Sequence, residues 1–210
     1  MGNTTNGESY ERISMKIFVI TAPSSAGKDS IVNKLKHKYH VPTSFTTRPK
    51  RDYEVDGKDY HFITKEEFYF KFNNNEILEH REYNTLLNGK PDTWYYGLSY
   101  DEIFKCYNNI GNYAVILDVQ GMRTIKEYIN RTFKDSIEVI TIMLQASYYT
   151  RLSRYLNRDK VTDDMVKEAI RRINADMNEI EPFINEYDIV LRSENNDLER
   201  NVKIIKSLCE

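Results

Sequence analysis

Short continuous apolar runs are the first feature of the chain. Residues 16–22 form such a run, residues 113–117 and 137–144 form two more, and a shorter one covers 188–191. A strand that is buried on both faces of a parallel sheet gives a continuous apolar stretch rather than an alternating one. We therefore expect these four segments to be buried parallel strands.

Apolar stripes with the period of a helix fill the intervals between these runs. The stripes are Ile31, Val32, Leu35 and Tyr39; Met122, Ile125 and Ile129; Val166, Ala169, Ile170, Ile173 and Met177; and Leu198, Val202 and Ile205. Ser99 and Glu102 match a capping box, which predicts another helix with Ile103 and Phe104 on its buried side. The alternation indicates an α/β fold with a doubly wound, mainly parallel sheet.

One long segment, residues 41–97, interrupts this alternation because it is rich in tyrosine, threonine, asparagine and charged residues. We interpret it as a lobe inserted into a single domain that covers residues 15–210. The expected divisions are a disordered polar arm (1–14), a core (15–40, 98–146 and 165–210), the inserted lobe (41–97) and a short helical lid (147–164).

The charge balance, the hydropathy and the cysteines exclude several classes of protein. The 30 basic and 32 acidic side chains give a formal net charge of −2, which argues against a protein that mainly coats nucleic acid or an anionic membrane. The sequence contains no apolar run long enough to span a membrane. Its two cysteines, Cys106 and Cys209, have no metal-like spacing, which favours a reduced, cytoplasmic protein.

The turn after the first apolar run is a candidate phosphate-binding loop. Residues 22–30 read Ala-Pro-Ser-Ser-Ala-Gly-Lys-Asp-Ser, against the P-loop pattern G-x-x-x-x-G-K-[ST]. In such a loop, backbone N–H groups at a helix N-terminus face the phosphates and Lys28 reaches the transferred group. The match is imperfect, because Ala22 replaces the first glycine and Asp29 stands where a magnesium-binding hydroxyl is usual. A Gly-Lys pair at an ordinary strand–helix turn is the alternative.

This loop supplies most of the predicted ATP-binding residues. They are Ser24, Ser25, Ala26, Gly27, Lys28, Asp29 and Ser30. The expected cofactor is Mg²⁺, held by Ser30 with help from Asp29.

Five short blocks follow one another between residues 46 and 121. They are Thr46-Thr-Arg48-Pro-Lys-Arg51, Glu54-Val-Asp-Gly-Lys-Asp-Tyr60-His-Phe62, Asn75-Glu-Ile-Leu-Glu79, Tyr95-Tyr96-Gly97 and Leu117-Asp118-Val-Gln120-Gly121. In this order and together with the P-loop, the blocks resemble guanylate kinases. The resemblance implies transfer of the ATP γ-phosphoryl to GMP or dGMP, which gives ADP and GDP, or dGDP.

The resemblance also implies roles for the matching positions. The acceptor phosphate would be clamped by Arg48, Arg51, Tyr60 and Tyr96, and the base would be read by Ser44, Glu79 and Asp118. Chemistry supports Glu79 independently, because guanine offers two adjacent donors, N1–H and the 2-amino group, whereas adenine has a lone pair at N1. From the residues alone, a solvated basic loop around Arg48 and a surface charge at Glu79 remain alternatives.

Arginines of the predicted lid and of the long helix complete the candidate site. Arg151, Arg154 and Arg158 follow the third apolar run, and Arg172 matches a family position that faces the phosphates. The catalytic residues that the resemblance implies are Lys28, Arg48, Arg154, Arg158 and Arg172, and Asn195 is added to the ATP site. An acceptor phosphate is already anionic, so positioning and charge neutralisation are sufficient without a general base. Solvent-facing helix arginines are the alternative.

The chain departs from the family in places. Leu98 stands where a hydroxyl near the guanine is usual, and Ile116 replaces an acidic residue. The segment of residues 84–93 is several residues longer than usual.

Two other functions compete with the kinase. One is a catalytically inactive module of the same fold that binds phosphopeptides, which Lys28 disfavours because such modules lose that lysine. The other is a kinase for a phosphorylated sugar, which would give Glu79 and Asp118 no base to read. We expect ATP and GMP or dGMP as partners, no nucleic acid and no membrane, and a monomer or homodimer.

Overall fold

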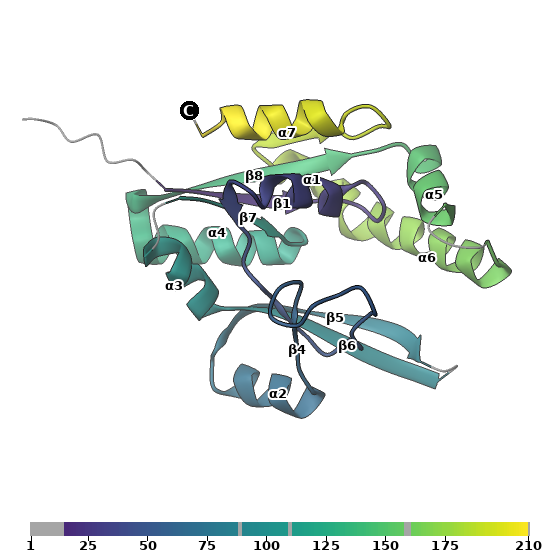
Figure 1. The fold of residues 1–210 in the computed structure, drawn as a ribbon, viewed down its shortest axis with the longest axis horizontal. Helices are drawn as coiled ribbons and strands as arrows, with labels where there is room; N and C mark the ends of the chain where they lie inside the picture. Colours follow the sequence, from purple (N-terminus) through teal and green to yellow (C-terminus); the bar gives the residue numbers. More distant parts are fainter. Residues whose placement is uncertain (1–14, 88–89, 109–110, 158–160, 210) are drawn as a thin grey trace, which may run out of the picture.

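The core of the protein is a five-stranded sheet. The computed structural model describes residues 15–87, 90–108, 111–157 and 161–209, so the predicted arm of residues 1–14 lies outside the described residues. The sheet has the order β2-β7-β1-β8-β9, and every neighbouring pair of its strands is parallel (Figure 1). The prediction of a mainly parallel α/β fold is confirmed.

The bounds of the elements follow the chain in this order. They are β1 (Met15–Thr21), α1 (Lys28–Leu35), β2 (Tyr39–His40), β3 (Phe45–Thr46), β4 (His61–Phe62), α2 (Lys65–Asn73), β5 (Ile77–Leu87), β6 (Lys90–Ser99), α3 (Tyr100–Asn108), β7 (Asn112–Ile116), α4 (Val119–Phe133), η1 (Lys134–Ser136), β8 (Ile137–Gln145), α5 (Tyr148–Leu156), α6 (Asp163–Glu179), η2 (Glu181–Glu186), β9 (Ile189–Arg192) and α7 (Leu198–Ser207).

Helices cover both faces of the core sheet, which is why its strands are apolar throughout. Alternate residues of β1 enter two separate apolar clusters: Ile17 and Val19 pack with α3 and α4, whereas Phe18 and Ile20 pack with α1 and α7. This is the doubly wound arrangement expected for a continuous apolar strand. The carboxyl end of β1 leads into the phosphate loop, and the carboxyl end of β8 leads into α5. Both ends lie on the side of the sheet where α6 also lies (Figure 1).

The segment predicted as an inserted lobe forms a second sheet of its own. Its order is β4-β3-β6-β5, and the antiparallel hairpin of β5 and β6 is its longest part. Residues 84–93, the segment that is longer than usual in the family, extend this hairpin through the pairs Asn84 with Thr93 and Thr85 with Asp92. The helix α2, which opens with a capping box between Thr64 and Glu67, lies against the hairpin (Figure 1).

Three sequence-based expectations need correction. Tyr39 does not continue α1, because the helix ends at Leu35 and Tyr39 opens β2 instead. Phe104 is 43% exposed on α3, whereas its neighbour Ile103 is fully buried in the core. Ile170 and Met177 are exposed on α6. The stripe on α6 is therefore buried only in part, because this helix packs mainly on α5 and η2 at the end of the sheet.

The chain passes between core and lobe at two neighbouring points. The β6 strand runs directly into α3, where the Ser99 hydroxyl accepts from the Glu102 backbone N–H at 3.3 Å, which is one of the two hydrogen bonds of a capping box. The Glu102 carboxylate in turn accepts from the backbone N–H of Thr43, on the other connection, at 3.0 Å. The two connections are therefore tied to each other.

Candidate active site

The phosphate loop lies between the end of β1 and the start of α1. Gly27 adopts a φ of +98° at the N-cap of α1, a conformation that favours glycine. A Cβ on Gly27 would lie 3.4 Å from Ser193 Oγ and 3.6 Å from Arg154 Nη1. Ala22, which replaces the first glycine of the pattern, is not among the residues with a positive φ and packs in the core. The substitution of that glycine is therefore compatible with the loop.

Lys28 and Asp29 open the helix that follows the loop. Their side chains form an ion pair of 3.5 Å between Lys28 Nζ and the Asp29 carboxylate, and Asp29 is 72% exposed. Within the described residues, no cluster of three metal-binding His, Cys, Asp or Glu side chains is present. Mg²⁺ in nucleotide kinases needs only one or two carboxylates, because substrate phosphates and waters supply the other ligands. The exposed Asp29 carboxylate and the Ser30 hydroxyl fit that requirement.

The structure places two of the predicted arginines at or near this loop. Arg154 on α5 donates from Nη1 to the Ser25 carbonyl at 3.4 Å. Arg172 on α6 lies over the ring of Tyr155, next in sequence to Arg154, and its Nε donates to Glu168. Arg158 lies outside the described residues. Arg151 is not exposed on the lid. Its side chain is buried and forms ion pairs with Asp176 and Glu181.

Asn195, the remaining predicted ATP-binding residue, lies close to the same loop. Asn195 is exposed in the turn between β9 and α7. Two residues earlier, Ser193 donates from its hydroxyl to the Ala26 carbonyl at 2.6 Å. The turn that carries Asn195 is thereby attached to the phosphate loop.

Arg48 and two tyrosines form the predicted phosphate clamp in the lobe. The Arg48 guanidinium makes a buried bidentate pair with Glu54, at 2.7 and 2.9 Å, and its Nε donates to the Tyr96 hydroxyl at 3.2 Å. The guanidinium also lies 5.5 Å from the centre of the Tyr60 ring. Glu54 therefore orients Arg48, and Arg48 brings the two tyrosines together.

The other predicted residues of the lobe surround this clamp. Arg51 is exposed, and its Nη1 donates to the Tyr53 hydroxyl at 2.9 Å while its backbone N–H donates to Glu54 at 2.8 Å. Ser44 lies just before β3, where its carbonyl accepts from His61 on β4 at 2.9 Å. The structure thus keeps Arg51 at the edge of the clamp, with its side chain open to solvent.

Glu79 and Asp118 meet where β5 passes the start of α4. A Cβ on Gly121 would lie 3.0 Å from Glu79 Oε2 and 3.3 Å from Asp118 Oδ1, so both carboxylates approach the same glycine. Asp118 caps α4 by accepting from the Gly121 N–H at 2.7 Å. Glu79 is only 6% exposed, and its Oε2 has no hydrogen-bond partner within the described part of the chain. Burial raises the pKa of Glu79 to about 7.

Sequence reasoning missed Arg81, which lies in the same place. Residues two apart on a strand point to the same face, so Arg81 follows Glu79 on the buried side of β5. Its Nε is 3.5 Å from the Asp118 carboxylate, and its Nη1 donates to the Tyr83 hydroxyl at 3.4 Å. The Nε is buried without a hydrogen-bond partner within the described residues. Within the described residues, the Glu79 Oε2 acceptor and the Arg81 Nε donor thus both lack a hydrogen-bond partner, although the Arg81 Nε lies within ion-pair distance of Asp118.

The loop and the lobe face each other across the molecule. Burial, the nearby Tyr96 and the Asp29 carboxylate raise the pKa of the Tyr60 hydroxyl to about 12. Asp29 belongs to the phosphate loop and Tyr60 to the clamp, so the two groups are close enough for one charge to act on the other.

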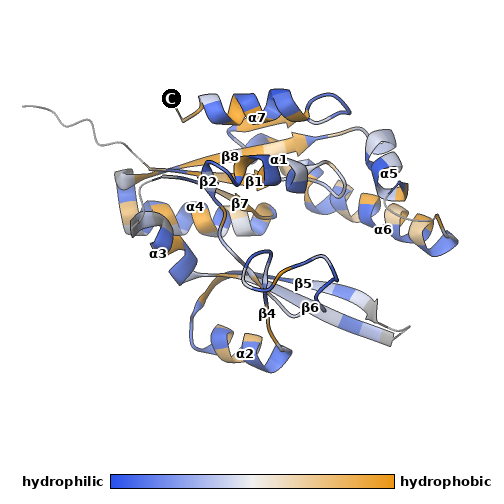
Figure 2. Cartoon of the chain, viewed as in Figure 1, coloured by the Kyte–Doolittle hydropathy of each residue, from blue (hydrophilic) through white to orange (hydrophobic). Residues whose placement is uncertain are grey.

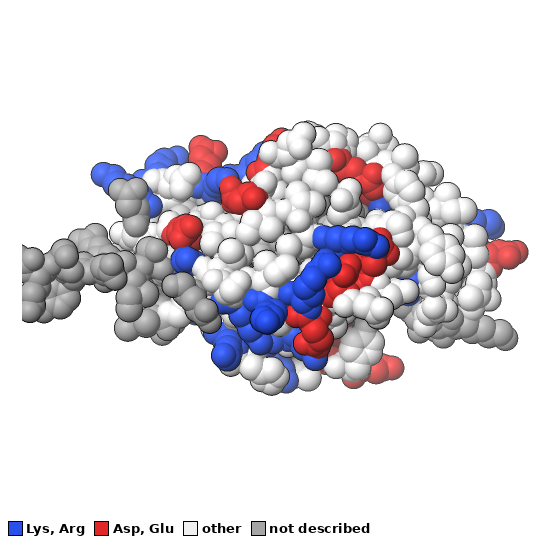
Figure 3. Space-filling view, turned by 90° about the horizontal axis from the view of Figure 1, so that it is seen from above, with Lys and Arg blue, Asp and Glu red and all other residues white. Residues whose placement is uncertain are grey.

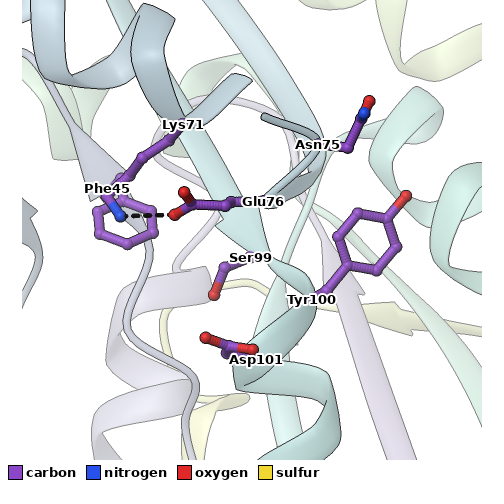
Figure 4. Close-up of a pocket in the computed structure, with 7 residues that line it drawn as sticks. All are labelled: Phe45, Lys71, Asn75, Glu76, Ser99, Tyr100 and Asp101. Atoms are coloured by element: carbon purple, nitrogen blue, oxygen red, sulfur yellow. Dashed lines mark hydrogen bonds and ion pairs between the residues drawn. The ribbon is translucent and has the colours of Figure 1, made fainter. Parts of the chain in front are cut away.

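A cavity of about 220 Å³ lies away from these residues. It is at the junction of lobe and core, between the end of α2 and the start of α3 (Figure 4). Lys71 and Glu76 form an ion pair of 2.8 Å across part of it. None of the predicted site residues lines it, so we place the site by its polar groups and not by this cavity.

The surface carries side chains of both charges (Figure 3). Seen from above, basic side chains lie beside acidic ones (Figure 3), as in the pair Lys34 with Glu199 at 2.7 Å. Within the described residues, no helix has the length and apolar character needed to span a membrane.

Comparisons with known proteins agree with these observations. The model of the guanylate kinase family matches residues 14–210. Guanylate kinase of Thermotoga maritima is 33% identical over 92% of this chain and 85% of its own length. Guanylate kinase 2, chloroplastic/mitochondrial, of rice is 30% identical over 92% of this chain, which spans 63% of that protein. The crystal structure of guanylate kinase from Anaplasma phagocytophilum superposes with a TM-score of 0.61 at 23% identity, covering 93% of this chain and 84% of its own. The chain belongs to the guanylate kinase family.

Proposed function

We propose that this protein transfers the γ-phosphoryl group of ATP to GMP or dGMP. Glu79 is the observation that carries the choice of acceptor, since it is a buried carboxylate with an unpaired oxygen beside Asp118. A buried group of this kind is costly unless a ligand completes its hydrogen bonds. Guanine supplies the two adjacent donors that such a carboxylate can accept.

Arg81 reads the O6 end of the guanine. Its unpaired Nε lies beside the carboxylates that take the N1–H and 2-amino donors. The O6 atom is next to N1 and is an acceptor, and arginine is a common partner for guanine O6 and N7. Adenine has an amino donor at that position, which would face the Arg81 donors. Arg81 therefore offsets the hydroxyl that is missing at the buried Leu98, the cross-strand neighbour of Glu79.

The transfer itself needs positioned charge. An oxygen of the acceptor phosphate, held by Arg48, Arg51, Tyr60 and Tyr96, attacks the γ-phosphorus, and the bond to the β–γ bridging oxygen breaks as ADP leaves. Lys28, the lid arginines Arg154 and Arg158, and Arg172 on α6 neutralise the charge that spreads over the transferring group. Bound Mg²⁺, which Asp29 and Ser30 would hold, supplies further neutralisation of the phosphate oxygens. Asn195 contributes to the adenine side.

The two competing functions receive less support. The loop keeps Gly27 and Lys28 in a geometry suited to phosphates, which a phosphopeptide-binding module does not need. A phosphorylated sugar would leave both Glu79 and Arg81 unpaired. We further propose that the protein acts in the cytoplasm, as a monomer or homodimer.

A coupled assay with ATP and Mg²⁺ tests the proposal. The acceptors are GMP, dGMP, IMP and AMP at equal concentrations. We expect GMP or dGMP to give the highest kcat/KM and AMP to give the lowest. Preference for AMP would overturn the assignment of Glu79, and turnover of none of them would favour the binding module.

A further inference from the structure

A buried arginine on α5 makes contacts that the transfer mechanism does not use. The side chain of Arg151 is 1% exposed. Its Nη2 donates to Asp176 on α6, and its Nη1 donates to Glu181 at 2.8 Å. A buried ion pair of this kind needs several well-placed partners to offset the loss of hydration.

This ion pair also holds one residue of the phosphate loop, at both its backbone N–H and its carbonyl. Arg151 Nε donates to the Ser24 carbonyl at 3.0 Å, and the Ser24 backbone N–H donates to Asp176 Oδ2 at 2.9 Å. Arg151, Asp176 and Ser24 thus close a ring of hydrogen bonds. The donor and the acceptor of a single residue are both fixed by side chains more than 120 positions away in the chain.

The loop has a local reason to need such support. Ser25, next to Ser24, adopts a φ of +62°. This left-handed conformation is disfavoured for residues other than glycine, because the Cβ crowds the following carbonyl oxygen. A strained residue persists only where its surroundings hold it in place.

Two further contacts hold the next carbonyls of the loop on the same principle. The Ser25 carbonyl accepts from Arg154, and the Ala26 carbonyl accepts from the Ser193 hydroxyl. In a trans peptide, the C=O and the N–H point in opposite directions. When the carbonyl is fixed, the direction of the N–H of the same peptide is therefore fixed too. The fixed Ser24 and Ala26 carbonyls therefore set the direction of the N–H groups that follow them, at Ser25 and Gly27. The Ala26 N–H donates within the loop to the Pro23 carbonyl at 3.1 Å.

We infer that Arg151 and Asp176 are positioning residues for the ATP phosphates. They hold the phosphate loop in its strained, binding-competent conformation and attach it to α5 and α6. This inference rests on the proposed use of the loop for ATP. It assigns no contact with the nucleotide to either residue.

The primary test replaces Arg151 with leucine and follows both substrates. We expect the Arg151→Leu variant to raise the KM for ATP about tenfold or more, with an unchanged KM for GMP. Calorimetric titration with a non-hydrolysable ATP analogue measures the same effect without turnover. Wild type that fails to bind the analogue would overturn the proposed function itself. Normal analogue binding by a folded Arg151→Leu variant would overturn only the present inference.

A second substitution separates positioning from general stability. Glycine adopts a φ of +62° without strain, so adding Ser25→Gly to Arg151→Leu should recover most of the lost ATP affinity. The matched control is Glu181→Gln, which removes a partner of the same arginine that does not touch the loop. We expect it to lower the melting temperature while the KM for ATP stays the same.

Asp176→Asn covers the case in which Arg151→Leu does not fold. It keeps the size of the side chain and removes its charge, and it should also raise the KM for ATP selectively. The inference would be overturned if the KM rises equally for both substrates, the melting temperature falls and Ser25→Gly gives no rescue. Arg151 and Asp176 would then have only a structural role.

Discussion

The five-stranded sheet of the core and the four-stranded sheet of the lobe bury different kinds of side chain. In the core, β1 and β8 are strongly apolar and pack on helices from both sides (Figure 2). In the lobe, β5 and β6 are paler in hydropathy and carry Glu79, Arg81 and Tyr96 (Figure 2). Within the described residues, three of the four buried side-chain polar atoms that lack a hydrogen-bond partner belong to the lobe, on Glu79, Arg81 and Trp94, and the fourth is the Tyr187 hydroxyl of the core. Substitutions in the two sheets should therefore affect different properties.

The largest effect should come from the core. Phe18 is fully buried between β1 and the helices α1 and α7, so Phe18→Ala should lower the free energy of unfolding by about 3–5 kcal/mol. Urea denaturation followed by circular dichroism measures this loss. The variant should keep a normal KM for both substrates wherever it remains folded. A loss below about 1 kcal/mol would mean that the core sheet does not carry the stability.

A slightly smaller effect, on catalysis alone, is expected at the phosphate loop between β1 and α1. Lys28→Ala removes a charge from the transferring group, so kcat should fall by about 10²- to 10³-fold or more. Its side chain is partly exposed and packs little. The melting temperature and GMP binding should therefore remain close to those of the wild type. Near-normal turnover would contradict the P-loop assignment.

Glu79→Gln should affect recognition more than stability. Glutamine keeps the size of the side chain but replaces one acceptor with a donor, which would face a donor of guanine. The mismatch should cost about 1–3 kcal/mol, or about 10- to 150-fold in kcat/KM for GMP. Titration with ATP should show an unchanged KM. If the use of GMP is unaffected, Glu79 does not read the base.

Arg81→Met tests the residue that sequence reasoning missed. We expect kcat/KM for GMP to fall about tenfold while AMP is affected less, so that the preference for GMP over AMP narrows. The matched control is Arg123→Met, because Arg123 forms a partly exposed ion pair with Glu186. If the ratio of kcat/KM for GMP to kcat/KM for AMP is unchanged in Arg81→Met, the Arg81 side chain does not contact the guanine base.

The smallest effect should appear in the pH dependence. Because the pKa of Glu79 is about 7 in the free protein, its ionised, guanine-accepting form should grow from about a tenth to about nine-tenths between pH 6 and 8. The KM for GMP should then fall roughly tenfold over this range. Part of the fall should disappear in Glu79→Gln, which leaves only the titration of the GMP phosphate.

Stability should respond to the same group with the opposite sign. The native state retains a proton on Glu79 that the unfolded chain, with a carboxyl pKa near ~4.3, has already released. The free energy of unfolding should therefore decrease as pH rises from about 4.3 to 7, and Glu79→Gln should weaken that decrease.

The core was more predictable from the sequence than the lobe, for a physical reason. Burial on both faces forces continuous apolar runs, so β1, β7, β8 and β9 were located to within a residue or two. The extended hairpin lacks such a signal, since residues 84–93 are mostly polar. Arg81 was recoverable by counting two positions from Glu79 along a strand. The pair of Arg151 and Asp176 was not, because 25 positions separate the partners and only packing brings them together.

The tie between Thr43 and Glu102 has a mechanical consequence. The lobe joins the core through two lengths of chain, and this bond holds them side by side. A body attached at two adjacent points keeps one easy rotation, about the line through those points, and resists translation and twisting. Any swing of the lobe is thus guided along an arc, so Tyr60 and the phosphate loop would approach each other in a repeatable orientation at every turnover.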